Sequence, residues 1–322
     1  MLSRVLPIEW FTLFAAMACA ILFHQMGLHW LTPDAKAFVF AFNHYLSPLF
    51  PAIFVIIIMI TVTDSRRDYL KLQLLYLMRM FALMMTAIFI HFNIKLWAPI
   101  MNPLRYDQIY HDMDASASRL INLIDFFHQL IPANLTNISH PYHMLFVGMF
   151  VLSFFLHGIK GKASSERLMT ATILLLILGA LSYVVAPAFG PFIFDPSPLP
   201  EARSSQDVMM GFHRQFIESQ GAYYDPTYFV AGLAAMPSLH AANVIVFCLC
   251  AERDLRWLLF LYVPIAFYIL VEAVALKWHY TIDLVVGILI GWLCYRLADW
   301  MAKSPRANRP RRTPDQSNGV VA

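Results

Sequence analysis

Charged residues are scarce in this chain of 322 residues: Asp, Glu, Lys and Arg make up 13% of it, whereas 59% of the residues are hydrophobic. Soluble domains carry about 25% charged residues, which keep their surfaces solvated. The sequence also contains no internal repeat, no low-complexity block and no segment with the composition of a soluble domain. These absences exclude an ordinary soluble protein and indicate a polytopic membrane protein.

Cysteine is also rare, and all four cysteines fall inside apolar stretches: Cys19, Cys248, Cys250 and Cys294. A thiol in such surroundings behaves as a small apolar side chain. The spacings of the four match neither a disulfide framework nor a metal-binding motif. The cysteines therefore predict no metal site.

The apolar residues gather in seven or eight stretches of about 17 to 25 residues, each long enough to cross a hydrocarbon core of about 30 Å. We place eight of them near residues 8–30, 46–62, 72–97, 142–157, 168–186, 234–251, 257–276 and 282–300. The first continues well beyond its alanine-rich part, so we interpret it as an uncleaved helix and not as a signal peptide. The sequence predicts an all-α fold, a polytopic membrane helical bundle with about eight transmembrane helices.

Most of the positive charge falls at the two ends of the chain and in alternate connections between these stretches. Fifteen of the 23 Lys and Arg residues have this placement. Because positive residues concentrate on the cytoplasmic side of membrane proteins, both termini are predicted to be cytoplasmic. The tail, residues 303–322, is expected to be a disordered basic end facing the membrane, although a stop-transfer signal explains its charge equally well.

Two long connections fall on the opposite, outer side. Residues 98–141 contain apolar side chains at helical spacing, which predict a helix lying in the membrane interface. Residues 187–233 are rich in proline, and Ser205 is the expected N-cap of a short helix there. Connections of this length in a compact protein are more often functional than not.

The stretch MPSLHAA, residues 236–242, places His240 at the outer end of a predicted span. Ser238 is a good N-cap for the helix that begins there. A helix N-terminus offers free backbone N–H groups and a partial positive charge, and so favours an anion. Taken alone, a histidine at a helix end is more often an interfacial residue than a catalytic one.

The stretch HYTID, residues 279–283, falls at the outer end of the last span. His279 and Asp283 are spaced i, i+4, so on a helix they share one face, and the carboxylate fixes the tautomer of the imidazole. An Asp inside a membrane span is costly unless it is paired, which makes it a functional candidate. A structural hydrogen bond also explains the pair, but His240 is predicted at the same depth on the same side.

MPSLHAA followed about forty residues later by HYTID resembles the second and third signature motifs of the type 2 phosphatidic acid phosphatase superfamily. The stretch PAFGPF, the Leu239 that replaces a frequent Gly, and HYTID are more similar to the inositol phosphorylceramide synthase and sphingomyelin synthase branches. The resemblance covers residues 168–300. It implies a six-helix core, an outward-facing site and phosphoryl chemistry without a metal or other cofactor.

The resemblance also implies a role for each motif residue. His279 would attack phosphorus and form a phosphohistidine, oriented by Asp283, which divides one difficult step into two. His240 would protonate the departing alkoxide and then activate the acceptor. Ser238 and the helix amides would hold phosphate oxygens, since phosphoryl transfer depends mainly on positioning and charge stabilisation.

The chain departs from the phosphatase pattern in its cations. A first motif with Lys and Arg is missing, and Ala273 stands where phosphatases carry an Arg before the nucleophilic histidine. Lys277, Arg203 and Arg214 are expected substitutes by location, and an interfacial charge explains each of them equally well. A phosphodiester carries one charge fewer than a phosphate monoester, so the loss favours headgroup transfer over dephosphorylation.

Three further polar residues fall within spans. His91 and Lys95 are spaced i, i+4 and either line a cavity or reach the interface. Glu272 has Lys95 or Lys277 as its expected partner. We favour a structural role for all three.

The leading hypothesis is a membrane phosphotransferase that moves a phosphate-linked group from a lipid phosphate donor to a lipid or alcohol acceptor on the periplasmic, extracellular or lumenal face. The alternative is a lipid phosphate or polyprenyl diphosphate phosphatase, and a transporter or binding scaffold is a third reading. No nucleic-acid partner is expected. The chain divides into N-terminal helices with an outer loop (1–141), a catalytic membrane core (142–302) and the tail (303–322).

Overall fold

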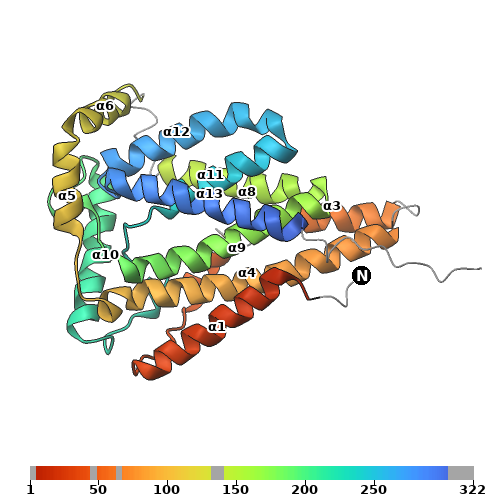
Figure 1. Ribbon diagram of the computed structural model, residues 1–322, viewed down its shortest axis with the longest axis horizontal. Coiled ribbons are helices and arrows are strands. Elements are labelled where there is room, and N and C mark those ends of the chain that lie inside the picture. Colours follow the sequence, from red (N-terminus) through yellow and green to blue (C-terminus); the bar gives the residue numbers. More distant parts are fainter. Residues whose placement is uncertain (1–4, 44–48, 63–66, 132–140, 304–322) are drawn as a thin grey trace, which may run out of the picture.

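The computed structural model describes residues 5–43, 49–62, 67–131 and 141–303, which form a helical bundle with no β-strand in these ranges (Figure 1). The α-helices are α1 (Pro7–Gln25), α2 (Ala35–Ala41), α3 (Leu49–Val62), α4 (Arg67–Met101), α5 (Asp107–Ser116), α6 (Ser118–Gln129), α8 (Pro141–Lys160), α9 (Lys162–Val185), α10 (Pro200–Glu218), α11 (Leu239–Asp254), α12 (Leu259–Ala275) and α13 (Thr281–Lys303). The predicted all-α bundle is confirmed.

Among the described residues, six helices are long and apolar enough to cross a membrane: α1, α4, α8, α9, α12 with the turn before it, and α13. Each of the eight predicted stretches contains a helix within its described residues. Two of them, α3 and α11, have only 14 and 16 residues and are shorter than a full span. The protein is a multi-pass integral membrane protein.

Helix α9 lies at the centre of the bundle, in contact with α4, α8, α11 and α13. Its side chains are buried on every side, including Leu174, Leu175 and Ala180. A helix that is apolar all round is stable only when other helices or lipid surround it. The remaining spans therefore pack around α9, and their ends determine where polar side chains meet.

Two glycines on α13 allow it to approach α11 closely. A Cβ atom at Gly287 would clash with the Ser238 carbonyl oxygen, and one at Gly291 would clash with the Ala242 carbonyl oxygen. Small residues four apart are typical of close helix contacts in membranes. This contact brings the start of α11, where His240 lies, next to the start of α13.

Three helices, α5, α6 and α10, form an end layer that lies across one end of the bundle (Figure 1). Helix α6 confirms the helix predicted in the first outer connection, and it exposes Leu120, Leu123 and Leu130. It also packs against α12. Its location in the membrane interface stays a prediction.

The expected N-cap of α10 is wrong. The helix begins earlier, at Pro200, with Leu199 as N-cap, because proline has a φ suited to the first helical position. The Ser205 hydroxyl instead donates to the Glu201 carbonyl inside the helix, at 3.0 Å. The division at residues 141 and 302 stays a prediction, and residues 304–322 of the tail lie outside the described residues.

Candidate active site

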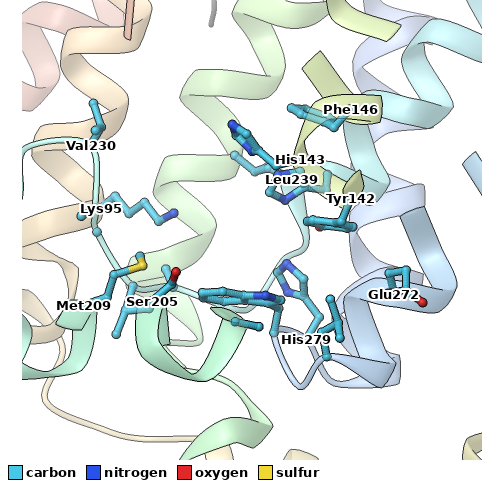
Figure 2. Close-up of a pocket in the computed structure, with 18 of the residues that line it drawn as sticks. Lys95, Tyr142, His143, Phe146, Ser205, Met209, Val230, Leu239, Glu272 and His279 are labelled. Carbon is cyan, nitrogen blue, oxygen red and sulfur yellow. The ribbon is translucent and has the colours of Figure 1, made fainter. Parts of the chain in front are cut away.

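A cavity of about 750 Å³ lies where α4, α8, α9, α11 and α12 meet α10 (Figure 2). Its wall is mostly aromatic and aliphatic, with side chains such as Phe146, Phe189 and Leu199. Sites for amphipathic small molecules have this size and this combination of apolar wall and few polar groups. Both His240 and His279 are among the lining residues.

His240 is the second residue of α11, where the helix end meets the cavity. The prediction that Ser238 caps this helix is confirmed, because its hydroxyl accepts a hydrogen bond from the Ala241 N–H at 3.3 Å. The His240 ring packs against Phe146 and Tyr142, with centroids 4.4 and 5.1 Å away. Ser238 itself is fully buried and does not line the cavity, so it fixes the helix end that carries His240.

The rings of His279 and His240 lie near each other, with their centroids 6.3 Å apart. The prediction that His279 shares a helix face with Asp283 needs correction, because α13 begins only at Thr281. His279 lies in the turn before the helix. Asp283 is in the first turn, and its Oδ2 accepts a hydrogen bond from the Tyr280 N–H at 2.8 Å.

The Nδ1 atom of His279 has two oxygen neighbours. The Ala235 carbonyl oxygen lies 2.9 Å away and Asp283 Oδ2 lies 3.5 Å away. The shorter contact is the hydrogen bond, and the carboxylate adds its charge beside it. A carbonyl oxygen can only accept, so Nδ1 carries the hydrogen and Nε2 presents a lone pair. This is the tautomer that a nucleophile needs.

The cations predicted to replace the missing arginine do not line the cavity. The Arg203 guanidinium donates to the Ser197 carbonyl at 2.9 and 3.2 Å, and Arg214 is exposed. Both fall beside the face of α10 that lines the cavity through Ala202, Ser205 and Met209. Lys277 lines a separate, smaller pocket of about 250 Å³.

Among the described residues, Lys95 is the only lysine or arginine that lines the cavity. His91, one turn before it, also lines the cavity and has its Nδ1 2.9 Å from the Leu176 carbonyl oxygen. In the sequence, the i, i+4 spacing of His91 and Lys95 was the feature that pointed to a shared position on one face of the helix. The structure thus places Lys95 in the cavity wall, where the sequence favoured a structural role.

Glu272 pairs with neither of its expected partners. Its Oε1 lies 2.6 Å from Nδ1 of His128, which comes from α6 in the end layer. The hydrogen bond that His128 donates to the Glu272 carboxylate raises the pKa of His128, against the opposing effect of burial. Both side chains line the cavity, and nothing in the sequence pointed to His128.

A family model described as the PAP2 superfamily matches residues 123–297, more than half of the chain. The chain belongs to the PAP2 superfamily. The superfamily predicted from MPSLHAA and HYTID is thereby confirmed, and this protein is a phosphatase or phosphotransferase enzyme of the membrane that acts on lipids. No curated protein and no solved structure matches the chain.

The matched range contains His240, His279 and Asp283, together with the glycines that join α11 to α13. It excludes α5 and everything before it. Among the described residues of this PAP2 protein, no group of three or more His, Cys, Asp or Glu side chains has an arrangement that holds a metal ion.

Proposed function

We propose that this protein transfers a phosphate-linked group from a lipid phosphodiester to the hydroxyl of a lipid or alcohol acceptor, through a phosphohistidine on His279. The observation that carries the proposal is that His240 and His279 line the same cavity, with their ring centroids 6.3 Å apart. Reacting atoms need to approach to about 3–3.5 Å before reaction. A phosphoryl group placed between the two rings would lie at about this distance from each imidazole.

In the first step the Nε2 lone pair of His279 attacks phosphorus, and the bond from phosphorus to the leaving oxygen breaks. Protonated His240 gives its proton to that oxygen, so the first lipid leaves as a neutral alcohol. The substituted imidazole of His279 becomes cationic. The Asp283 carboxylate, 3.5 Å from Nδ1, stabilises this charge.

In the second step His240, now neutral, takes the proton of the acceptor hydroxyl. The acceptor oxygen attacks phosphorus, the P–N bond breaks, and its electron pair returns to Nε2 of His279. His240 is protonated again, so the cycle closes without any further reactant. With water as the acceptor, the same steps describe the alternative, a lipid phosphate or diphosphate phosphatase.

The charge of the cavity favours a diester as the donor. Among the described residues that line the cavity, Lys95 is the only lysine or arginine, and the charge of Glu272 is paired with His128. The cavity thus has no cluster of lysine and arginine side chains to balance the two negative charges of a phosphate monoester, whereas a phosphodiester carries only one. A phosphate monoester would leave a second negative charge in a largely apolar site, which is costly.

The similarity to the inositol phosphorylceramide and sphingomyelin synthase branches also supports transfer. Leu239, which replaces a frequent glycine, lines the cavity beside His240. Its side chain packs over Gly179 of α9, where a Cβ atom would meet the Leu239 Cδ2 at 2.5 Å. Leu239 thus narrows the cavity at the point where the leaving group would depart.

The proposed site faces the non-cytoplasmic side, with both termini cytoplasmic. The cavity lies at one end of the helices, and the connections rich in Lys and Arg lie at the other end, near Arg67, Lys160 and Arg253. Positive residues concentrate on the cytoplasmic side, which supports this orientation.

The test uses purified protein in detergent and a lipid phosphodiester labelled in both its phosphate and its acyl chains. The products are separated with and without a long-chain alcohol acceptor, for wild type, His240→Ala and His279→Asn. We expect the phosphate label on the acceptor with wild type, and neither transfer nor acid-labile protein-bound phosphate with His279→Asn. If the phosphate label instead appears in a water-soluble phosphate monoester, in the same amount with and without the acceptor, the enzyme hydrolyses its donor and does not transfer the group. Turnover by His279→Asn at the wild-type rate would overturn both transfer and hydrolysis through His279.

A further inference from the structure

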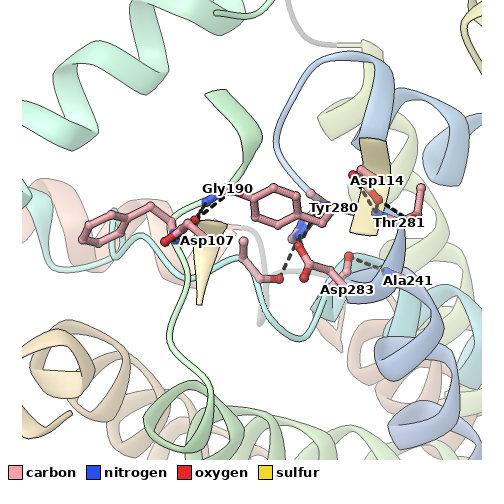
Figure 3. Close-up of polar contacts among 11 residues, drawn as sticks. Asp107, Asp114, Gly190, Ala241, Tyr280, Thr281 and Asp283 are labelled. Carbon is pink, nitrogen blue, oxygen red and sulfur yellow. Dashed lines mark hydrogen bonds and ion pairs between the residues drawn. The ribbon is translucent and has the colours of Figure 1, made fainter. Parts of the chain in front are cut away.

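Two carboxylates on α5, Asp107 and Asp114, contact the segment that carries His279 (Figure 3). Helix α5 precedes the range that the family model matches, and neither residue lines the large cavity. Both accept hydrogen bonds from residues more than 160 positions away in the chain. Asp107 is buried and Asp114 is partly buried, and a buried carboxylate is costly unless several donors surround it.

Asp107 is almost fully buried, with 3% of its surface exposed, and collects donors from two segments. Its Oδ1 accepts from the Phe189 and Gly190 N–H groups, both at 2.9 Å, and from the Tyr280 hydroxyl at 3.0 Å. Burial raises the pKa of Asp107, while these donors and Arg105 favour the ionised form. The ionised carboxylate suits this place because every neighbour within hydrogen-bond distance donates.

The contacts of Asp107 close a ring around His279. Next to the anchored Phe189, the Ala188 carbonyl accepts from the Ala235 N–H at 2.8 Å. The Ala235 carbonyl is in turn the acceptor for Nδ1 of His279. His279 is followed directly by Tyr280, whose hydroxyl returns to Asp107. One carboxylate therefore fixes both the acceptor that orients the imidazole and the backbone that bears it.

Asp114, two turns further along α5, anchors the next residue. It accepts from the Thr281 N–H at 3.1 Å and from the Thr281 hydroxyl at 2.5 Å. Thr281 is the first residue of α13, so Asp114 satisfies a free N–H group at that helix end, where a negative charge is favourable. The backbone on the C-terminal side of His279 is thus held at two successive residues, Tyr280 and Thr281.

We propose that Asp107 and Asp114 are positioning residues that hold His279 for attack on phosphorus. The proposal rests on His279 being the nucleophile of the proposed transfer. An asparagine at position 107 has no negative charge, and its NH2 group would face the Phe189 N–H, which Oδ2 of Asp107 accepts at 3.1 Å. The turn that carries His279 would then shift, and a misplacement of about 1 Å lowers a rate about 100-fold.

The experiment compares Asp107→Asn, Asp114→Asn and Tyr280→Phe with the matched control Asp112→Asn, an exposed carboxylate on the same helix. The measurements are kcat, KM, melting temperature and the single-turnover rate of phosphohistidine formation at saturating donor. We expect Asp107→Asn to lower that rate about 100-fold and Asp114→Asn about tenfold, with KM nearly unchanged. Asp112→Asn should match wild type.

The Tyr280 hydroxyl donates a hydrogen bond to Asp107. In the double variant, the losses in rate caused by Asp107→Asn and Tyr280→Phe should therefore not add. A lowered melting temperature with wild-type phosphohistidine formation would overturn the proposal and leave a merely structural role. If Asp107→Asn does not fold, Asp114→Asn and Tyr280→Phe decide by the same measurement. Activity retained by His279→Asn would instead reject the proposed function, so the two failures are distinct.

Discussion

Helices α11 and α13 carry polar groups at both of their ends, and the two ends are built differently. His240 and Asp283 lie at one end, and Asp254 and Asp299 lie at the other. The separation is about 20–25 Å along each helix. The same two helices therefore allow a direct comparison of two buried polar clusters.

The end that holds Asp254 and Asp299 is closed by ion pairs. Arg167 of α9 donates to Asp254 and, from its Nε at 3.3 Å, to Asp299. Arg253 adds a second contact to Asp299 at 2.7 Å. The Ser164 hydroxyl donates to Asp254 at 3.0 Å. These charges neutralise one another, so this cluster fastens the helices together.

The end that holds His240 and His279 is open. His240 has ring contacts on one side and the cavity on the other, and Nε2 of His279 carries a lone pair. The comparison teaches that burial of polar groups does not by itself mark a site. The end that we propose to be functional is the one whose polar groups keep unused donors or acceptors beside a cavity.

The sharpest test of the open end is His240→Ala. General acid catalysis contributes about 10²–10⁴-fold, so phosphohistidine formation from a donor with an alkyl leaving group should slow by that factor. A nitrophenyl donor, whose leaving group needs no proton, should react at nearly the wild-type rate in a single turnover. The exposed His24, changed to Ala, serves as the control. Equal losses with both donors would exclude His240 as the acid.

The closed end should respond in stability and not in catalysis. Arg167→Met leaves Asp254 and Asp299 partly uncompensated, and breaking a buried ion pair costs about 3–5 kcal/mol of unfolding free energy. The matched control is Arg253→Met, whose side chain is 38% exposed and should cost less than about 1 kcal/mol. Thermal unfolding in detergent measures both, and kcat of the folded protein should stay within about twofold of wild type. A large loss of kcat in Arg167→Met would show that the closed end also contributes to catalysis, and would contradict the contrast between the two ends.

The smallest effect is expected where the end layer meets the cavity. The raised pKa of His128 means that its pair with Glu272 stabilises the fold fully below the ordinary value of 6.5, and that this stability is lost as pH rises through the raised value. The difference in melting temperature between wild type and His128→Gln should therefore be largest at low pH, corresponding to about 1 kcal/mol, and shrink at alkaline pH. If the difference in melting temperature did not depend on pH, the ion pair between His128 and Glu272 would not contribute to stability as proposed.

Local signals account for the residues that could be predicted. Ser238, His240, His279 and Asp283 stand in two short motifs, and hydrophobic length located all eight helical stretches. The sequence predicted that His279 and Asp283 share a helix face, but His279 lies in the turn before α13. Such signals are limited because i, i+4 spacing does not reveal where a helix begins. His279 and Asp283 of the motif lie 3.5 Å apart, but the carbonyl that accepts from the imidazole belongs to Ala235, 44 residues away.

Other parts of the site depended on contacts between distant segments. Asp107 and Tyr280 are 173 residues apart, and His128 and Glu272 are 144 apart. Neither pair has a local pattern, because each side chain alone looks like an ordinary polar residue of an outer loop or a span. Helix phase likewise decided that Arg203 and Arg214 lie beside the cavity-lining face of α10, while Lys95 of α4 lines the cavity.

The sequence by itself determined that this protein is an all-α membrane bundle of the PAP2 superfamily and which histidines its motifs contain. Scarce charge, apolar length and two motifs suffice for that, since each is a property of neighbouring residues. Only the tertiary structure decided which cation lines the cavity, how the imidazole of His279 is oriented and that α5 anchors its turn. Those depend on helices packing at short range, which the glycines of α13 permit and no local pattern specifies.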